Sequence, residues 1–433
     1  MNGLRAKERV VPALVILGIA LMILVVVSGL FRGGESTEPA PEAPFEASET
    51  GPLPFEAAPE AQTPGVRVER PEIHVTRREV PGLTIKQIRA ADLSLHEAMF
   101  YTPVGDGKVL CGLCPARCLL GNGERGQCRV RINLDGKLYT LVYGRLVAVH
   151  DDPIEKKPLY HFMPGTRAFS IATAGCNLGC VFCQNWQISQ ASPESARHIK
   201  ASPESVVAAA KRAGCDSIAY TYTEPTVFYE FMLDTAKLAK KEGIRNVWVT
   251  CGYINPEPLR ELCKVMDAAN IDLKGFTEEY YATYCKASLA PVKETIRIAR
   301  EEGVWVEVTN LVVPGANDDP ETIRAMCRWL TETVGPDVPL HFSRFFPNYR
   351  MLDKPPTPAA TLAEAARIAR AEGLHYVYIG NLATRTGDDT FCPQCGHAVI
   401  ERRGYEITSK EIVSGVCPAC KTPIAGVWGE GRE

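Results

Sequence analysis

The chain has 433 residues, of which 45% are hydrophobic, and a formal net charge of −3 at pH 7. This length is enough for two or three domains, and the small net charge gives no reason to expect nucleic acid as a partner. Most of the 16 cysteines fall into three clusters, in residues 111–128, 176–183 and 392–420. Clusters with C-x2-C spacing indicate metal ligation and a reducing compartment.

The N-terminal segment predicts a membrane anchor. Residues 10–31 contain no charged side chain, and a helix of this length spans ~33 Å, which matches the ~30 Å core of a bilayer. A cleaved signal peptide has a shorter apolar region, so we predict an uncleaved single-pass transmembrane helix within residues 1–31. Residues 32–70 are rich in Pro, Ala and Glu and predict a disordered linker.

Residues 71–165 form a predicted N-terminal module with four cysteines. Cys111, Cys114, Cys118 and Cys128 have the spacing C-x2-C-x3-C-x9-C. Four thiolates in so short a segment can close a tetrahedral zinc site or hold an auxiliary iron–sulfur cluster. Both kinds of site use four cysteines, so the sequence leaves the two alternatives open.

The next cysteine cluster has only three members. Cys176, Cys180 and Cys183 have the spacing C-x3-C-x2-C and follow an apolar run, residues 168–174, that predicts a strand. Three thiolates on a four-iron cube leave one iron open, whereas structural zinc uses four protein ligands and three close cysteines cannot all form disulfides. The spacing resembles that of the radical S-adenosylmethionine (SAM) superfamily, and the flanking residues resemble its glycyl-radical-activating branch.

Strands and amphipathic helices alternate through residues 166–385, the predicted catalytic core. Helix ends carry local signals such as the Ser-Pro-Glu sequence at residues 202–204 and the glycine at 214. Repeated β/α units predict a parallel sheet, curved into a barrel or part of one. A doubly wound open sheet is the alternative, but no G-x-G-x-x-G turn follows the first strand. Further strands are predicted at residues 217–222, 246–250, 270–273, 304–313, 340–345 and 375–380.

The last predicted module, residues 386–433, contains two C-x2-C pairs. Cys392, Cys395, Cys417 and Cys420 have the spacing C-x2-C-x21-C-x2-C, which is typical of a zinc ribbon. We predict zinc rather than iron, as a structural cross-link.

Several motifs occur in one order along the chain. They are Cys-Gly-Leu-Cys-Pro-Ala-Arg-Cys, Ala-Gly-Cys-Asn with Cys-Gln-Asn-Trp, Tyr-Thr-Glu-Pro, Asp-Leu-Lys, Val-Pro-Gly, His-Phe-Ser-Arg-Phe-Phe-Pro and Tyr-Val-Tyr-Ile-Gly-Asn. From about residue 85 to the C-terminus, this set resembles the AmmeMemoRadiSam-system radical SAM enzymes, relatives of pyruvate formate-lyase activating enzyme. The resemblance implies an α/β fold with a partial (β/α)6 TIM-type barrel, a [4Fe–4S] cluster on the three central cysteines, and SAM as co-substrate.

Chemistry in such barrels takes place at the carboxyl ends of the strands, where polar residues recur in this sequence. We predict that Glu224 accepts from the SAM ammonium group, and that Lys274, placed by Asp272, donates to its carboxylate or ribose. The predicted catalytic residues are Glu224, Lys274 and His341. The predicted cofactor-binding residues are Cys176, Cys180, Cys183, Asn185, Tyr222, Glu224, Asp272, Lys274 and Asn310.

The predicted function is reductive cleavage of SAM to a 5′-deoxyadenosyl radical that abstracts hydrogen from a substrate the sequence does not name. The predicted partners are a low-potential electron donor of the ferredoxin or flavodoxin type, and a protein substrate or another component of the AmmeMemo system. One alternative is an activase that acts on a partner glycyl-radical enzyme. Another is a non-catalytic iron–sulfur electron carrier, which would need neither Glu224 nor Lys274.

Two arguments conflict on the orientation of the predicted anchor. Arg5, Lys7 and Arg9 precede it and only Arg32 closely follows, which favours an exported body. However, SAM, low-potential electrons and reduced thiols are supplied in the cytosol. We therefore predict a membrane protein whose catalytic body faces the cytoplasm and whose short N-terminus lies outside.

Overall fold

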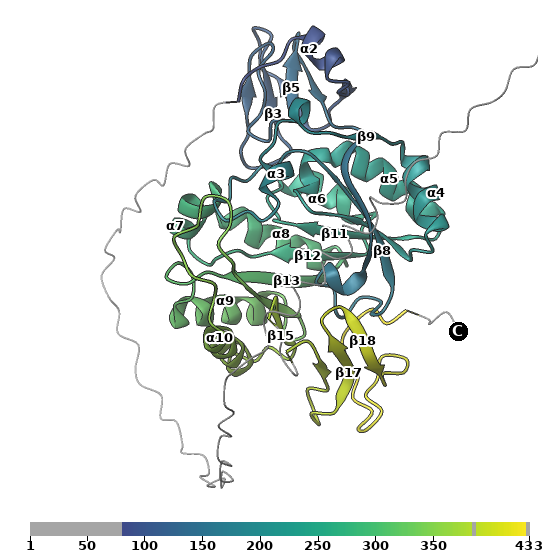
Figure 1. The fold of residues 1–433 in the computed structure, drawn as a ribbon, viewed down its shortest axis with the longest axis vertical. Helices are drawn as coiled ribbons and strands as arrows, with labels where there is room; N and C mark the ends of the chain where they lie inside the picture. The colour runs from purple at the N-terminus through teal and green to yellow at the C-terminus, as the bar shows by residue number, and fades with distance from the viewer. Residues whose placement is uncertain (1–79, 383–386, 430–433) are drawn as a thin grey trace, which may run out of the picture. The chain divides into compact units, whose positions relative to one another are not determined.

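The largest sheet of the described chain has nine strands, and seven of them are parallel (Figure 1). The computed structural model describes residues 80–382 and 387–429. Every residue of the second parallel strand is buried, as is usual inside a parallel sheet. The parallel strands are β8 (Arg167–Thr173), β10 (Ser217–Tyr220), β11 (Arg245–Thr250), β12 (Ala268–Asp272), β13 (Trp305–Val312), β14 (Leu340–Arg344) and β15 (Val377–Gly380).

The parallel strands lie side by side in chain order, which confirms the predicted α/β class with repeated β/α units. The resemblance implied six such strands, whereas the sequence pattern predicted seven, and the structure has seven, the last being β15. The sheet is open, because β15 forms one edge and a short antiparallel extension forms the other. This extension consists of β7 (Arg145–Pro153), which pairs with β8, and β9 (Ile199–Lys200).

Helices connect the strands, and their ends follow local sequence signals. The Ser202 hydroxyl accepts from the Ser205 N–H, with proline next in the chain, and Gly214 ends this first connection with a φ of +68°, as predicted. The helices are α4 (Pro203–Arg212), α5 (Tyr229–Lys241), α6 (Pro256–Cys263), α8 (Ala290–Glu301), α9 (Pro320–Thr333) and α10 (Ala359–Ala371). Shorter helical segments are η1 (Ile154–Lys156), α3 (Trp186–Ser189), η2 (Pro193–Ser195), η3 (Pro225–Phe228), α7 (Glu278–Tyr280) and the π-helical η4 (Tyr281–Cys285).

The N-terminal cysteine module consists of two small antiparallel sheets and helix α2 (Ile85–Ala90). Val109, Leu113 and Val130 of this module belong to the same buried cluster as Ile171 and Leu259 of the β/α core. The module is therefore packed directly onto the core, without a solvated gap. Its strands are β1 (His96–Glu97), β5 (Arg131–Leu134) and β6 (Lys137–Thr140) in one sheet, and β2 (Tyr101–Pro103), β3 (Val109–Cys111) and β4 (Leu119–Leu120) in the other.

The C-terminal ribbon is a three-stranded antiparallel sheet of β16 (Thr390–Phe391), β17 (Ala398–Arg403) and β18 (Glu406–Lys410), yellow in Figure 1. It has a buried cluster of its own, in which Val399 and Cys417 pack with Tyr160 and Tyr378 of the β/α core. The Arg402 guanidinium adds a hydrogen bond of 2.9 Å to the Tyr160 carbonyl. Apolar burial and this buried polar contact together hold the ribbon against the core.

The predicted fold class requires one correction. No helix within the described ranges is long and apolar enough to cross a membrane. Their longest helix, α9, has 14 residues and spans ~21 Å, which is shorter than a bilayer core of ~30 Å. The prediction of a transmembrane helix is therefore wrong for the described residues. The predicted membrane localisation depended on that helix and is wrong with it. Residues 10–31 and the linker at 32–70, to which these predictions were assigned, lie outside the described residues.

Candidate active site

The three-cysteine loop leaves the carboxyl end of β8 and is held in place by backbone hydrogen bonds on both sides. Gly179 and Val181 donate to the carbonyls of Cys285 and Tyr284, at 2.8 and 2.9 Å. Gly175, with a φ of +98°, opens the loop where a Cβ would lie 2.7 Å from the Cys128 carbonyl oxygen. Only glycine fits this position without strain. The loop is therefore fixed before any cofactor binds.

The pKa values of two of the loop thiols, Cys180 and Cys183, are raised. Burial raises the pKa of Cys183 to about 11. The pKa of Cys180 is also raised, by a hydrogen bond with Cys285 and by burial. A metal that binds these thiols must therefore displace their protons. The sequence separates Cys285 and Cys251 from the loop by many residues, and spacing provided no signal that they lie beside it.

Glu224 lies beyond the end of β10 and is completely buried. Both of its carboxylate oxygens already accept hydrogen bonds from the protein. Oε1 accepts from the Thr226 N–H and hydroxyl, at 3.0 and 2.6 Å, and from the Thr250 hydroxyl at 2.7 Å. Oε2 accepts from the Cys251 N–H at 2.8 Å and from its thiol at 2.6 Å. The carboxylate thus ties the end of β10 to the end of β11.

Lys274, Asp272 and Asn310 gather at the ends of β12 and β13. The Lys274 ammonium contacts Asp272 Oδ2 at 2.7 Å, which is the pairing that the sequence analysis expected. Burial lowers the pKa of Lys274, but the neighbouring Asp272 carboxylate raises it more, so it lies well above its ordinary value. The side chain therefore presents a permanent positive charge beside the cysteine loop.

Asn310 contains a buried acceptor that has no partner. Its amide nitrogen donates to the Leu273 carbonyl at 2.7 Å, whereas its Oδ1 is buried and accepts no hydrogen bond. A buried carbonyl without a donor costs free energy, which a ligand that brings an N–H or O–H group would recover.

Asn185 and Tyr222 contact one another, but the Tyr222 side chain points elsewhere. The Asn185 amide donates to the Tyr222 carbonyl at 2.7 Å. The Tyr222 hydroxyl donates to Asp152, and the Lys157 ammonium lies 4.5 Å from the centre of its ring. Burial lowers the pKa of Lys157 to about 8. The Tyr222 backbone therefore lies at the strand ends, whereas its side chain contacts Asp152 of β7 and Lys157, the residue after η1.

The structure does not bring His341 to this region. His341 is the second residue of β14, so its predicted place at the carboxyl end of the strand is wrong. Its Nε2 lies 2.7 Å from Glu307 Oε2, and Glu307 also accepts from the N–H groups of Tyr160 and His161. The His341 ring stacks on Tyr378. The reason is strand direction, since residues near the start of a parallel strand face the opposite end of the sheet.

His161 joins this buried group to the ribbon. Its Nδ1–H donates to the Ala425 carbonyl at 2.6 Å, and its Nε2 accepts from the Tyr378 hydroxyl at 2.5 Å. A carbonyl can only accept, so the neutral tautomer with a proton on Nδ1 satisfies both bonds. Burial lowers the pKa of His161 to about 4.

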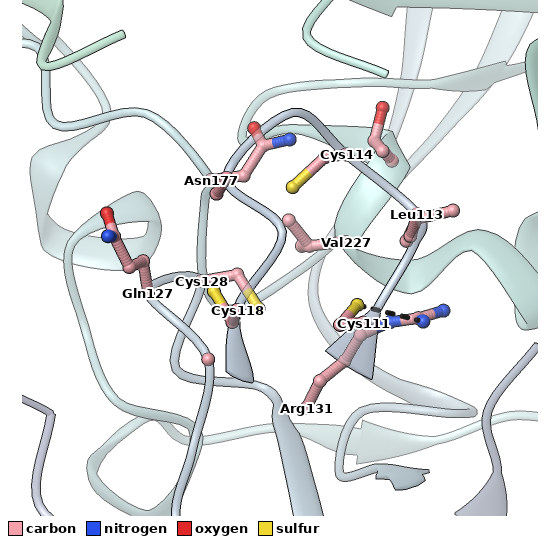
Figure 2. A pocket seen from close by; sticks show the side chains of 12 residues that line it. Cys111, Leu113, Cys114, Cys118, Gln127, Cys128, Arg131, Asn177 and Val227 are labelled. Carbon is pink, nitrogen blue, oxygen red and sulfur yellow. Dashed lines mark hydrogen bonds between the residues drawn. The ribbon is translucent and has the colours of Figure 1, made fainter. Parts of the chain in front are cut away.

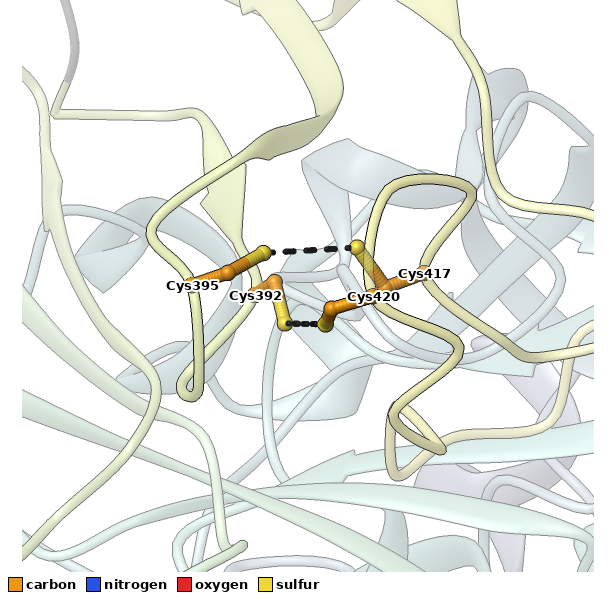
Figure 3. Close-up of side chains that lie close together, drawn as sticks. All are labelled: Cys392, Cys395, Cys417 and Cys420. Atoms are coloured by element: carbon orange, nitrogen blue, oxygen red, sulfur yellow. Dashed lines mark hydrogen bonds between the residues drawn. The ribbon is translucent and has the colours of Figure 1, made fainter.

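The two four-cysteine sets differ in geometry. In the ribbon, the Sγ atoms lie 3.6 Å apart for Cys392 and Cys420 and 3.7 Å apart for Cys395 and Cys417 (Figure 3). All four thiols lie within 4.8 Å of one another. Within the described residues, this is the one set of three or more metal-binding side chains gathered so closely. The cysteines of the N-terminal module instead surround a cavity of about 20 Å³ (Figure 2).

Comparison with known proteins identifies the class. The sequence profile of the radical SAM superfamily matches residues 170–330. The uncharacterized protein MJ0808 of Methanocaldococcus jannaschii is 46% identical over 332 residues, which cover 76% of this chain and 99% of that protein. The pyruvate formate-lyase-activating enzyme of Clostridium pasteurianum is 24% identical over 166 residues, 38% of this chain and 68% of that enzyme. Among solved structures, a domain of pyruvate-formate lyase-activating enzyme from Bacteroides vulgatus has a TM-score of 0.33 at 20% identity, and covers 38% of this chain and 99% of that one.

A three-cysteine loop after the first strand of a parallel β/α sheet, together with the profile match and the homology to an activating enzyme, defines an iron–sulfur enzyme of the SAM-dependent radical class. The chain belongs to the radical SAM superfamily and is homologous to pyruvate formate-lyase-activating enzyme. The superfamily implies a [4Fe–4S] cluster and SAM. The residues present fit both, because three thiols share one fixed loop and because the unpartnered Asn310 Oδ1 and the charged Lys274 lie at neighbouring strand ends. The superfamily also implies an external reductant.

Proposed function

We propose that Cys176, Cys180 and Cys183 hold a [4Fe–4S] cluster whose open iron binds SAM. When bound, the cluster supplies one electron that cleaves SAM to methionine and a 5′-deoxyadenosyl radical, which abstracts hydrogen from a substrate. The observation that supports this proposal most directly is the cation of Lys274, whose side chain is 15% exposed, next to the cysteine loop. An electron carrier has no use for a charged side chain held at a strand end, whereas a SAM carboxylate does.

The protein residues have separate roles in this proposal. Lys274 binds the SAM carboxylate or ribose, and Asp272 holds its ammonium group in place. Asn310 Oδ1 accepts from the ligand and so satisfies a buried acceptor that otherwise lacks a partner. Glu224 receives the SAM ammonium group at Oε2 in place of the Cys251 thiol, which holds this position in the free protein.

Anaerobic incubation of reduced protein with SAM tests the proposal. We expect the wild-type chain to release 5′-deoxyadenosine and the Cys180→Ala variant to release none, because each thiolate holds one corner of the cluster. Cys263→Ala is the matched control, since Cys263 is a buried cysteine in α6 outside the three cysteine clusters. Retained cleavage in Cys180→Ala would refute the assignment, and the Cys263→Ala control should cleave SAM like the wild-type chain.

We further propose that the chain is an AmmeMemoRadiSam-type enzyme that acts on a protein partner. The shared motif order and the homology to an activating enzyme support this proposal. A uniformly deuterated candidate partner would transfer deuterium into 5′-deoxyadenosine, which mass spectrometry detects. If deuterium transfers from a small molecule in a cell extract and from no protein of that system, the protein-substrate proposal fails.

A further inference from the structure

The cavity of the N-terminal module is lined by thiols, apolar groups and one buried cation. Cys111, Cys114, Cys118 and Cys128 surround it, with Leu113, Ala116 and Val227 among the apolar lining (Figure 2). The Arg131 guanidinium donates to Cys111 Sγ at 3.8 Å. The Arg131 charge is already paired with Glu230, so its contribution to the thiols is this hydrogen bond, and hydrogen bonds to sulfur tune the potential of iron–sulfur clusters.

The sulfur–sulfur distances of the ribbon show the spacing that a site for a single metal ion requires. Zn–S bonds of ~2.3 Å in a tetrahedron place the sulfurs ~3.8 Å apart, and the ribbon separations of 3.6 and 3.7 Å agree with this value. The thiols of the N-terminal module are spread more widely, since among the described residues only the ribbon cysteines gather three or more ligand atoms within 4.8 Å. A four-iron cube needs this wider arrangement, because metal and sulfide ions lie between its thiolates.

The cavity shares a wall with the three-cysteine loop. Asn177, which lies between Cys176 and Cys180 in the chain, lines the cavity together with Thr226. Where Gly175 opens that loop, its Cα approaches the Cys128 carbonyl so closely that no side chain fits between them. The Asn255 side chain adds a hydrogen bond of 2.6 Å to the Gly112 carbonyl. The two cysteine sets are thus joined by direct packing, with no intervening element.

We propose that Cys111, Cys114, Cys118 and Cys128 ligate a second [4Fe–4S] cluster that passes single electrons to the catalytic cluster. A reduced flavodoxin-class donor is oxidised by one electron at the partly exposed side of the N-terminal module, and the electron then moves to the three-cysteine site. No bond forms or breaks in this relay. The relay part rests on the proposed function, whereas the ligation part is independent of it.

Metal analysis tests ligation in a full-length chain in which Cys176, Cys180 and Cys183 are all changed to Ala. After anaerobic reconstitution with ferrous iron and sulfide, we expect about four irons per chain and an equal amount of acid-labile sulfide. An added Cys114→Ala change should remove both, and an added Cys263→Ala change should remove neither. A chain that holds no iron, and binds a second zinc equivalent beside that of the ribbon, would overturn the assignment.

A comparison of two reductants tests the relay. In the Cys114→Ala variant, we expect cleavage of SAM driven by reduced flavodoxin to fall to the level without donor, and cleavage driven by titanium(III) citrate to continue. A small reductant reaches the catalytic site without the second cluster. Unchanged flavodoxin-driven cleavage, or equal loss with both reductants, would overturn the relay. If the wild-type chain does not cleave SAM with either reductant, it is the proposed function that fails. The metal analysis still tests whether the four N-terminal cysteines ligate a cluster.

Discussion

The buried ion pair beneath the N-terminal cysteines makes a quantitative prediction about stability. Arg131 and Glu230 pair at Glu230 Oε1, and each side chain is only 2% exposed. The same oxygen accepts from the Met99 N–H at 2.8 Å. Glu230→Gln keeps an oxygen that can accept from both donors, but leaves the guanidinium without a counter-charge.

Removing one partner of a buried ion pair costs ~3–5 kcal/mol. Because the glutamine oxygen preserves the hydrogen bonds, we expect a loss near the lower limit, ~3 kcal/mol in the free energy of unfolding. With a slope of ~3 kcal/mol per molar urea, the unfolding midpoint falls by ~1 M. Replacing both partners by apolar residues, as in Arg131→Met with Glu230→Leu, should recover most of this loss.

Anaerobic urea unfolding followed by tryptophan fluorescence measures the effect, since Trp248 is buried in β11 and reports on the core. The control is Glu242→Gln, which removes an exposed ion pair with Lys211 and should leave the midpoint almost unchanged. The reasoning is refuted if Glu230→Gln lowers the free energy of unfolding by less than ~1 kcal/mol, or if the double variant is no more stable than the single one.

Three further predictions concern packing, metal content and pH. Gly175→Ala should lower both thermal stability and iron content, because the added Cβ would lie 2.7 Å from the Cys128 carbonyl oxygen. The control is Gly214→Ala, because Gly214 also has a positive φ but has open space around it. This control should lower thermal stability and leave the iron content unchanged. Cys417→Ser should remove zinc and lower the melting temperature while the iron–sulfur absorption stays unchanged, and a zinc-free wild-type chain would contradict this. The pKa of His161 is lowered to about 4, so between pH 6.5 and 4 the unfolded chain binds a proton that the folded chain does not, and the free energy of unfolding should fall as pH falls through this window. His161→Gln should flatten this pH dependence of stability. An unchanged slope would refute the view that His161 causes it.

The sequence by itself determined the features that depend on local spacing. Three thiols within one short loop lie near one another whatever the fold, so Cys176, Cys180 and Cys183 could be predicted as one set of ligands from spacing alone. The same argument held for the two C-x2-C pairs of the ribbon. Alternating strands and capped helices predicted the α/β core, because caps such as Ser202 act over only a few residues.

Tertiary structure decided everything that depends on contacts across the chain. Arg131 and Glu230 are 99 residues apart, and Cys251 reaches Glu224 from a different strand end, so no spacing rule relates these pairs. His341 was assigned to the wrong end of the sheet, because the position of a residue along a strand depends on where pairing begins. The two four-cysteine sets have different spacings, C-x2-C-x3-C-x9-C and C-x2-C-x21-C-x2-C, but spacing alone did not show how far apart the fold places their thiols. In the ribbon a hairpin closes them to contact distance, and in the N-terminal module Arg131, Asn177 and Val227 hold a cavity open between them.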